Sequence, residues 1–454
     1  MSKRLYIVSL FALLLGGAIS HRAVQAQDTL YARHIIRDLS DPAFHGRGAS
    51  YKGDSLAADY LRAEFRHIGV MPLCENFFQH YTYSTFSMEG DCWMEVEGRK
   101  LRNFDEFRVA PWSQTIECPN QKVVTLPWKV FSDPLRRQQF VEKHQPELEG
   151  SFVYIDASSL RRSDKEGWRK GREMLAALKR ENPFGSKGIV VGLSELNTMS
   201  LGGCEREHGY VFVEVLAKSM PRRVDNIGIC VHTQFHSDYR TQNVCGVVYG
   251  DVDTMVVLTA HYDHLGTMGD GYRYLSSAAG EVQTAGEVVF GGAHDNASGV
   301  AAVMDLARMA VQERPHYTLV FMLFSGEEAG LKGSTYAAQH HLIDYKKVRL
   351  LLNIDMFCGG TEGLMVFNAK SENTKPFYER MKTLNEALQI APEVRPRDNA
   401  ANSDHWPFRD LCPAMFVLTM GMPYGGYHDT ADVCSKCGLQ YYNNYLLLLS
   451  ALTM

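Results

Sequence analysis

The sequence predicts an α/β fold, a three-layer sandwich with a mixed, mostly parallel central sheet and a smaller inserted domain. From about residue 240 onward, apolar runs of strand length alternate with helical segments, which is typical of a sheet covered by helices. Between about residues 91 and 235, short strand-like runs are mixed with loops instead. A second, smaller domain therefore interrupts the first one.

The chain opens with the features of a secretory signal peptide. Lys3 and Arg4 are followed by an apolar run over residues 5–19 and by small residues up to Ala26. We therefore expect cleavage after Ala26, an exported protein that is periplasmic or secreted, and no stable membrane insertion afterwards. An uncleaved membrane anchor is the alternative, but the apolar run is short for a membrane span.

Charge and length limit the possible partners and domains. Loss of residues 1–26 lowers Lys plus Arg from 47 to 44 against 52 acids, so the formal net charge moves from −5 to −8. This balance gives no indication of a nucleic-acid partner. The expected division is residues 27–90 for the first part of the main domain, 91–235 for the insert and 236–454 for the rest of the main domain.

The individual elements follow from the periodicity of apolar residues. Residues 54–69 place apolar side chains on one helical face and end at Gly69, a C-cap residue. In the insert, residues 161–181 are charge-dense and predict a solvated helix. The other expected elements are insert strands 151–155 and 188–193; main-domain strands 243–249, 255–260, 318–324, 350–354, 364–368 and 414–418; and helices 298–311 (capped by Asn296 or Ser298) and 331–340.

Acidic and histidine side chains follow these main-domain strands where the strands end. Because strand ends meet at one edge of such a sheet, the side chains should gather there. Imidazole and carboxylate ligands suit zinc, and two zinc ions about 3.5–4 Å apart need a shared carboxylate. The five residues that fit are His261, Asp295, Glu328, Asp355 and His428.

Each of these residues also has an ordinary structural explanation. Asp295 and Asn296 are suited to cap a helix, and Glu327-Glu328 to form a solvated turn. Asp355 is harder to explain in this way, because an unpaired carboxylate in an apolar strand is costly. Their joint placement at strand ends is what predicts a metal site.

Five motifs in order resemble the zinc aminopeptidases of peptidase family M28. They are His261-Tyr262-Asp263, Gly292-Ala293-His294-Asp295-Asn296-Ala297-Ser298-Gly299, Gly326-Glu327-Glu328, Asn353-Ile354-Asp355-Met356 and Tyr427-His428-Asp429-Thr430. His45-Gly46-Arg47-Gly48 resembles the N-terminal segment of that family. The resemblance covers about residues 35–80 and 236–450. It implies a zinc-peptidase-like sandwich that holds two zinc ions per chain.

The resemblance also implies a role for each ligand. His261 and Asp355 would bind one zinc, Glu328 and His428 the other, and Asp295 would bridge the two. The peptide bond between Asp295 and Asn296 would be cis.

Two further residues match the reacting groups of the family. Glu327 matches the general base that takes a proton from water and passes it to the leaving amine. Asp263 matches the carboxylate that orients His261.

The resemblance gives only general expectations for three further features and for the remaining histidines. Ser403-Asp404-His405 resembles a segment that supports the ligands or contacts substrate, and Tyr427 is a candidate to steady the oxyanion. The insert resembles a protease-associated domain around its two predicted strands. The histidines without a ligand role, which we expect to be structural or on the surface, are His264, His294, His316, His340 and His341.

The ten cysteines include one CxxC, Cys434-Ser435-Lys436-Cys437. A structural zinc ribbon needs a second such pair, which the chain lacks. A disulfide or two idle thiols is therefore the expectation, and the pairing of the others is not readable from spacing.

The function that follows is hydrolysis of N-terminal residues from peptides by a zinc-activated water. A glutaminyl cyclase on the same scaffold is the alternative, but such enzymes typically carry Trp where this chain has Tyr427. A carboxypeptidase or dipeptidase stays open, because the metal centre does not fix which peptide end is held. A non-catalytic binding domain would have lost ligands that are all present here.

Overall fold

The computed structural model describes residues 29–160, 163–277, 280–421 and 426–454. The predicted signal peptide and its cleavage site at Ala26 lie outside the described residues, as does part of the loop that precedes His428. Within the described ranges, no helix combines the length and apolarity needed to cross a bilayer.

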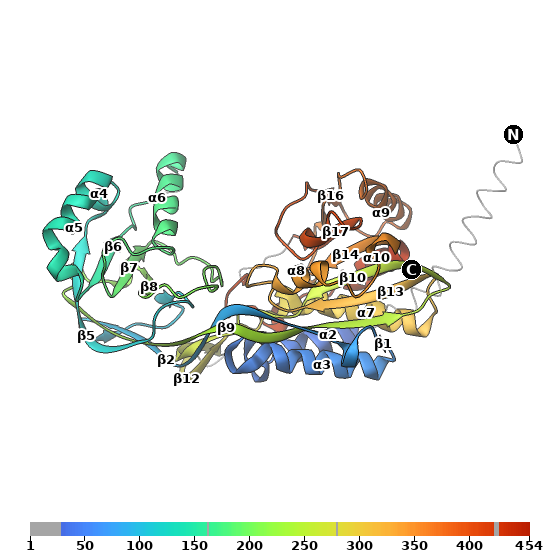
Figure 1. Ribbon diagram of the computed structural model, residues 1–454, viewed down its shortest axis with the longest axis horizontal. Helices are drawn as coiled ribbons and strands as arrows, with labels where there is room; N and C mark the ends of the chain where they lie inside the picture. The colour runs from blue at the N-terminus through green and yellow to red at the C-terminus, as the bar shows by residue number, and fades with distance from the viewer. Residues whose placement is uncertain (1–28, 161–162, 278–279, 422–425) are drawn as a thin grey trace, which may run out of the picture.

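Two lobes are joined by a pair of long strands (Figure 1). The strands are β2 (Phe78–Val96) and β9 (Asn226–Val248), which pair antiparallel over most of their length. One end of β9 pairs with the sheet of the larger lobe, and the other end pairs with β5 in the smaller lobe. The lobes are thus parts of one continuous hydrogen-bonded ribbon.

The larger lobe has a mixed, mostly parallel sheet, as the sequence predicts. In spatial order after β9, its strands are β13 (Tyr317–Phe324), β10 (Val252–His261), β14 (Val348–Ile354), β17 (Ala414–Met420), β15 (Gly363–Phe367) and β16 (Val394–Pro396). The four strands from β13 to β17 are parallel to one another, whereas β9 and β15 run antiparallel to their neighbours in that group. The short β1 (Met71–Pro72) pairs with β9.

Helices cover both faces of this sheet and complete three layers. One face buries α2 (Thr29–Leu39), α3 (Gly53–Ile68), α7 (Ser298–Gln312), α9 (Lys375–Leu388) and α10 (Tyr442–Thr453) in a single apolar core. The opposite face packs against α8 (Lys332–Gln339) and the turn at Trp406–Phe408. The helices α3, α7 and α8 lie within two residues of the expected bounds.

The smaller lobe is built on its own sheet. Strands β5 (Ile116–Leu126), β6 (Phe152–Asp156), β7 (Gly188–Leu193) and β8 (Val211–Leu216) are parallel, and β4 (Phe107–Val109) is antiparallel at the edge. Helices α4 (Trp128–Phe131), α5 (Pro134–Leu148) and α6 (Lys165–Ala177) pack on it around a separate core. Of the charged segment expected as a helix over 161–181, α6 covers Lys165–Ala177, and the Asp164 side chain caps it by accepting from Gly167 N; residues 161–162 lie outside the described residues.

The expected domain limits, 90/91 and 235/236, fall inside β2 and β9. The sequence predicted a strand only from residue 243, whereas β9 begins at Asn226. Residues 232–242 are mainly polar because they lie in the two-stranded part of the ribbon, where both faces are partly solvated. They therefore lack the apolar run that marks a buried strand. A hairpin of β11 (Thr267–Ser277) and β12 (Gly280–Val289), and β3 (Arg99–Lys100), lie beside β2.

One disulfide joins Cys358 to Cys437 and closes a separation of 79 residues. Cys434 is a free thiol, so the CxxC is neither a disulfide nor a pair of idle thiols. Spacing alone could not show this, because Cys358 comes near Cys437 only when β14 and the C-terminal segment pack together.

Glu106 of the smaller lobe predicts a pH-dependent stability. Its carboxylate accepts bonds from Arg102 N at 3.0 Å, Ser219 Oγ at 2.8 Å and Arg99 Nη1 at 3.0 Å. Burial opposes ionisation, but these donors outweigh it and lower the pKa of Glu106 from 4.5 to about 2. A lowered acid pKa contributes stability above pH 4.5 that is lost as the pH falls towards 2.

Glu106→Gln should therefore destabilise the protein near pH 6 and become equal to the wild type near pH 2. Urea unfolding across this pH range measures the difference, with the exposed Glu149→Gln of the same lobe as the control. A constant difference at all pH values would contradict the assigned cause.

Candidate metal centre

The first half of the site lies between β10, β14 and the start of α7. His261 ends β10, and its Nε2 lies 3.3 Å from Asp295 Oδ1 and 3.5 Å from Asp355 Oδ1. Asp355 follows β14 directly, and its Oδ2 accepts from Ser403 Oγ at 2.8 Å. Asp355 Oδ1 has no hydrogen-bond donor among the described residues. Three ligand-type atoms thus converge on one buried point.

The second half uses the other oxygen of Asp295. His428 Nε2 lies 3.2 Å from Asp295 Oδ2 and 3.1 Å from Glu328 Oε2. Glu328 comes from the turn after β13, and His428 comes from the loop between β17 and α10. Asp295 therefore faces one histidine–carboxylate pair with each of its two oxygens.

Asp295 is held between a strand end and a helix start. The peptide bond between Asp295 and Asn296 is cis, as the sequence predicted. Asn296 Oδ1 accepts from Gly299 N in the first turn of α7 and from Met356 N beyond β14, both at 3.0 Å. This amide thus caps the helix and fixes the Asp295 loop to the Asp355 loop. The backbone N–H of Asp295 donates to Asp432 Oδ2 at 3.1 Å.

Arg47 holds these loops from behind. The side chain is fully buried and donates to the backbone carbonyls of five residues at 2.5–3.4 Å, namely Leu39, Tyr262, Gly291, Gly292 and Asp295. Tyr262 and Asp295 belong to the two loops that carry the first-half residues. A single guanidinium therefore fixes the spacing between them.

Glu327 and Asp263, for which the sequence predicts roles beside the ligands, lie next to the candidate ligand atoms. Glu327 lies within 4.8 Å of ligand-type atoms of His261 and Asp355 without belonging to either half of the bridged pair. The Asp263 carboxylate accepts from Glu327 N at 3.1 Å and Glu328 N at 3.3 Å. Its Oδ1 is 3.7 Å from His261 Nδ1, whereas its backbone carbonyl is closer, at 3.2 Å. Asp263 thus positions the glutamates at least as directly as His261.

The charges in this site favour a cation. Buried carboxylates outnumber the histidines, and burial raises the pKa of Asp263 to about 8. Burial disfavours the charged form of His428, but Glu328 and Asp295 outweigh it and raise its pKa to about 11. Buried charges of one sign need compensation in a medium of low dielectric. The donor set of two imidazoles and three carboxylates, with Asp355 Oδ1 turned inward, therefore fits a pair of divalent cations that prefer N and O ligands.

His264 is a contact that the sequence analysis missed. It is fully buried, and its Nδ1 lies 2.7 Å from Glu328 Oε1, so it is not a remote structural histidine. Its position three residues after the candidate ligand His261 is the sequence feature that could have indicated this contact. His294 is also buried and contacts Cys358 Sγ at 3.1 Å, whereas His316, His340 and His341 are exposed, as expected.

Ser403-Asp404-His405 was expected to support the ligands or to contact substrate, and Tyr427 to steady the oxyanion. Ser403 binds Asp355 and also accepts from Asn353 Nδ2 at 2.7 Å, which fits a supporting role. Asp404 is fully buried, and burial raises its pKa to about 6. Tyr427 is 46% exposed and stacks on His428, with ring centroids 3.9 Å apart. Its role towards an oxyanion stays a prediction.

The smaller lobe also reaches this site. Met199 O lies 2.7 Å from His428 Nδ1, and Arg108 Nη2 pairs with Asp429 Oδ2 at 3.0 Å. Arg108 Nη1 also donates to the carbonyl of Asn197. A loop of the insert therefore orients the imidazole that follows β17. Such contacts between polar loops leave no periodic pattern in the sequence.

Comparison with known proteins identifies the larger lobe. The model of peptidase family M28 matches residues 243–452, which contain all five predicted ligands. Residues 243–452 belong to peptidase family M28. Two curated relatives, both described as probable zinc metalloproteases, come from Pyricularia oryzae (36% identity over 27% of this chain) and Pyrenophora tritici-repentis (37% over 24%). The matches span about a fifth of the length of those relatives, 22% and 20%.

The fold of the whole chain, insert included, also has solved counterparts. A zinc aminopeptidase from Bacillus subtilis superposes with a TM-score of 0.64 at 16% identity, over 94% of each chain. A peptidase M28 precursor from Shewanella amazonensis superposes with a TM-score of 0.63 at 16% identity, over 96% of this chain and 94% of that one. The M28 lobe and its insert therefore share one known architecture.

Proposed function

We propose that this protein is an exported aminopeptidase that uses two zinc ions to hydrolyse N-terminal residues from peptides. The observation that carries the proposal is the pair of contacts made by Asp295. Each of its oxygens faces a separate histidine–carboxylate pair, His261 with Asp355 and His428 with Glu328. One carboxylate shared in this way suits two cations at short separation.

The residues divide into holding and reacting groups. His261, Asp295, Glu328, Asp355 and His428 would hold the ions, which supply Lewis-acid polarisation of the scissile carbonyl and a lowered pKa for water. Glu327 takes a proton from the attacking water and delivers it to the leaving nitrogen. Burial and the neighbouring Glu328 charge raise the pKa of Glu327 well above its ordinary value, although His261 opposes them. A carboxyl with a raised pKa is suited to carry a proton between two groups.

The proposal that the enzyme cleaves from the amino end of peptides is supported by structural neighbours, because the metal-binding residues alone do not fix which end is held. The Bacillus subtilis protein is a zinc aminopeptidase, and a third neighbour, from Aneurinibacillus, is an aminopeptidase with a TM-score of 0.59 at 18% identity. Export rests on the signal-like residues 1–26. The bridged arrangement at Asp295 favours this function over the cyclase alternative, which uses one zinc.

The deciding assay compares aminoacyl chromogenic amides, an amino-terminally blocked peptide and a glutaminyl peptide. The protein would be tested as purified, after chelation and after zinc is restored. We expect zinc-dependent release from free-amine substrates alone. Cleavage of the blocked peptide only would place the protein among carboxypeptidases or endopeptidases. Cyclisation of the glutaminyl peptide without hydrolysis would place it among the cyclases.

Arg108 predicts that the insert is needed for one of the two ions. Arg108→Gln removes the charge that holds Asp429 and the Asn197 carbonyl, so His428 should be less well oriented. Loss of a contact that orients a metal ligand typically lowers metal affinity about 10–100-fold. Zinc titration against a competing chelator should therefore show one weakened site and one unchanged site.

Arg223→Gln is the matched control, because Arg223 is an exposed arginine of the same lobe that pairs with Asp225. Two unchanged zinc affinities in Arg108→Gln would show that the interlobe contact does not support the site.

A further inference from the structure

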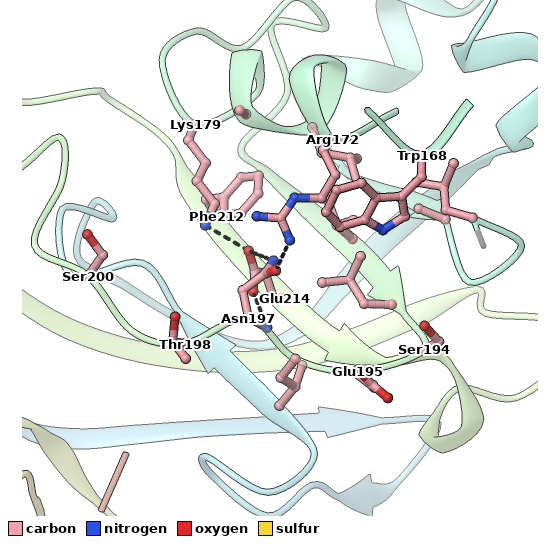
Figure 2. Close-up of a pocket in the computed structure, with 17 residues that line it drawn as sticks. Trp168, Arg172, Lys179, Ser194, Glu195, Asn197, Thr198, Ser200, Phe212 and Glu214 are labelled. Carbon is pink, nitrogen blue, oxygen red and sulfur yellow. Dashed lines mark hydrogen bonds and ion pairs between the residues drawn. The ribbon is translucent and has the colours of Figure 1, made fainter. Parts of the chain in front are cut away.

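A cavity of about 720 Å³ lies in the smaller lobe, between α6, β7, β8 and the loop over residues 194–200 (Figure 2). Its apolar lining, referred to below as the apolar floor, includes Leu175, Val191 and Phe212, while Trp168 forms one wall. The loop contributes the hydroxyl groups of Thr198 and Ser200 to the lining. This combination of an apolar floor and a few polar groups is typical of a ligand site.

One acid in the cavity is already neutralised. Glu214 is buried and accepts from Lys179 Nζ at 2.7 Å, Asn197 Nδ2 at 2.9 Å and Asn197 N at 3.3 Å. Burial opposes its ionisation, but Lys179 and these donors outweigh burial and lower the pKa of Glu214. The Lys179–Glu214 pair therefore has no net charge, and it anchors the loop through Asn197.

Arg172 is the second cation of the lining, which is formally neutral because it also holds Glu195 and Glu214. Its guanidinium lies over the Trp168 ring at 5.2 Å and donates to Asn197 Oδ1 at 2.8 Å. Within the described parts of the chain, no carboxylate is within ion-pair distance of Arg172, whereas Arg169 of the same helix pairs with Glu173 at 2.6 Å. Glu195 points away from the guanidinium (Figure 2). The remaining N–H groups of Arg172 are suited to a carboxylate.

The same loop connects the cavity to the metal centre. Thr198 and Ser200 line the cavity, and Met199 between them contacts His428 Nδ1 at 2.7 Å. The chain from Asn197 to Met199, with a hydrogen bond to Arg172 at one end and to His428 at the other, limits the separation of Arg172 and His428 to at most roughly 18 Å. An extended peptide of at most about five or six residues therefore reaches from one to the other at 3.3–3.6 Å per residue.

We propose that this cavity binds the C-terminal carboxylate of peptide substrates through Arg172, while their amino end lies at the metal centre. The inference rests on the proposed function, because it places the second end of the same substrate. Trp168 and the apolar floor would contact the last side chains. The protein would then favour short peptides with a free carboxylate over amidated or much longer chains.

The test is a series of leucyl peptides of two to eight residues, each prepared as the free acid and as the C-terminal amide. For lengths of about five or six residues, the acid should have a KM about tenfold lower than the amide, and for dipeptides no such preference should exist. Arg172→Gln should abolish the preference, and Arg172→Lys should keep part of it. Arg169→Gln, the same charge change on the same helix, should leave it intact.

Turnover of leucyl p-nitroanilide separates the inference about the cavity from the proposed aminopeptidase function. This substrate cannot reach the cavity, so an unchanged kcat in Arg172→Gln shows that the loop still supports His428. Calorimetric binding of the hexapeptide acid and amide to Glu327→Gln protein gives a readout without turnover. Equal affinities for the acid and the amide would overturn the inference. The same loss of acid preference in Arg169→Gln as in Arg172→Gln would overturn it as well. Absent anilide turnover with a preserved acid preference in binding would overturn the proposed function alone.

Discussion

Glu327→Gln is expected to lower kcat by about 10²–10⁴ and to leave both zinc ions bound. The amide keeps the size of the side chain but cannot accept the proton of the attacking water. Glu327 belongs to neither half of the Asp295-bridged pair, so its replacement should not release an ion. Steady-state kinetics on leucyl p-nitroanilide, with zinc content measured by atomic absorption, tests both parts.

Glu328→Gln is the matched comparison, because it makes the same chemical change one residue later. Glu328 contacts His428 and His264, so this variant should lose zinc as well as activity. If Glu327→Gln lost zinc to the same extent, Glu327 would be a ligand and another group would have to act as the base.

Arg47→Met should be the most destabilising single change in the described part of the chain outside the ligands. The variant leaves the five buried carbonyls without their donor, and each unsatisfied group costs about 1–3 kcal/mol. We expect a loss of about 4 kcal/mol or more in urea unfolding, since neighbouring groups relax only in part. Burial lowers the pKa of Arg47 to about 10, so the side chain stays charged at neutral pH.

Arg47→Lys should recover only part of this loss, because an ammonium has three donors and no planar fork. Arg37→Met is the control, since the Arg37 side chain is 62% exposed and a surface change typically alters stability by less than about 0.5 kcal/mol. If Arg47→Met lowered the free energy of unfolding no more than Arg37→Met does, the five buried carbonyls would have found other donors.

The sequence predicted the sheet and the clustering of the candidate ligands for a physical reason. Strands buried on both faces are apolar runs, and a polar residue directly after such a run marks the strand end. Asp355 and His261 were identified in this way, and the structure brings them together with Asp295. The clustering is thus observed, while the roles of these residues stay predictions for the assays above.

The contacts between lobes were not predictable in the same way. Met199, Arg108 and Asn197 belong to segments without periodicity, and nothing in their spacing indicates which distant residue they meet. Arg47 was quoted only as part of a motif, because a lone arginine in a sequence is far more often exposed than fully buried. His264 was expected to be structural or on the surface because it matches no ligand position of the family that the sequence resembles.

The pairing of β2 with β9 sets the distance between the lobes, and it is regular except for register shifts between Tyr83 and Thr85 and between Met88 and Cys92. Removing two residues from each strand would bring the lobes closer by roughly 7 Å, about two peptide units, and keep every side chain on its original face. Removing one residue from each would instead turn the smaller lobe to present its opposite side. Within each regularly paired stretch, the distance between the two ends of a peptide bound as proposed above therefore changes in steps of residue pairs, and relatives with different ribbon lengths should trim peptides of correspondingly different lengths.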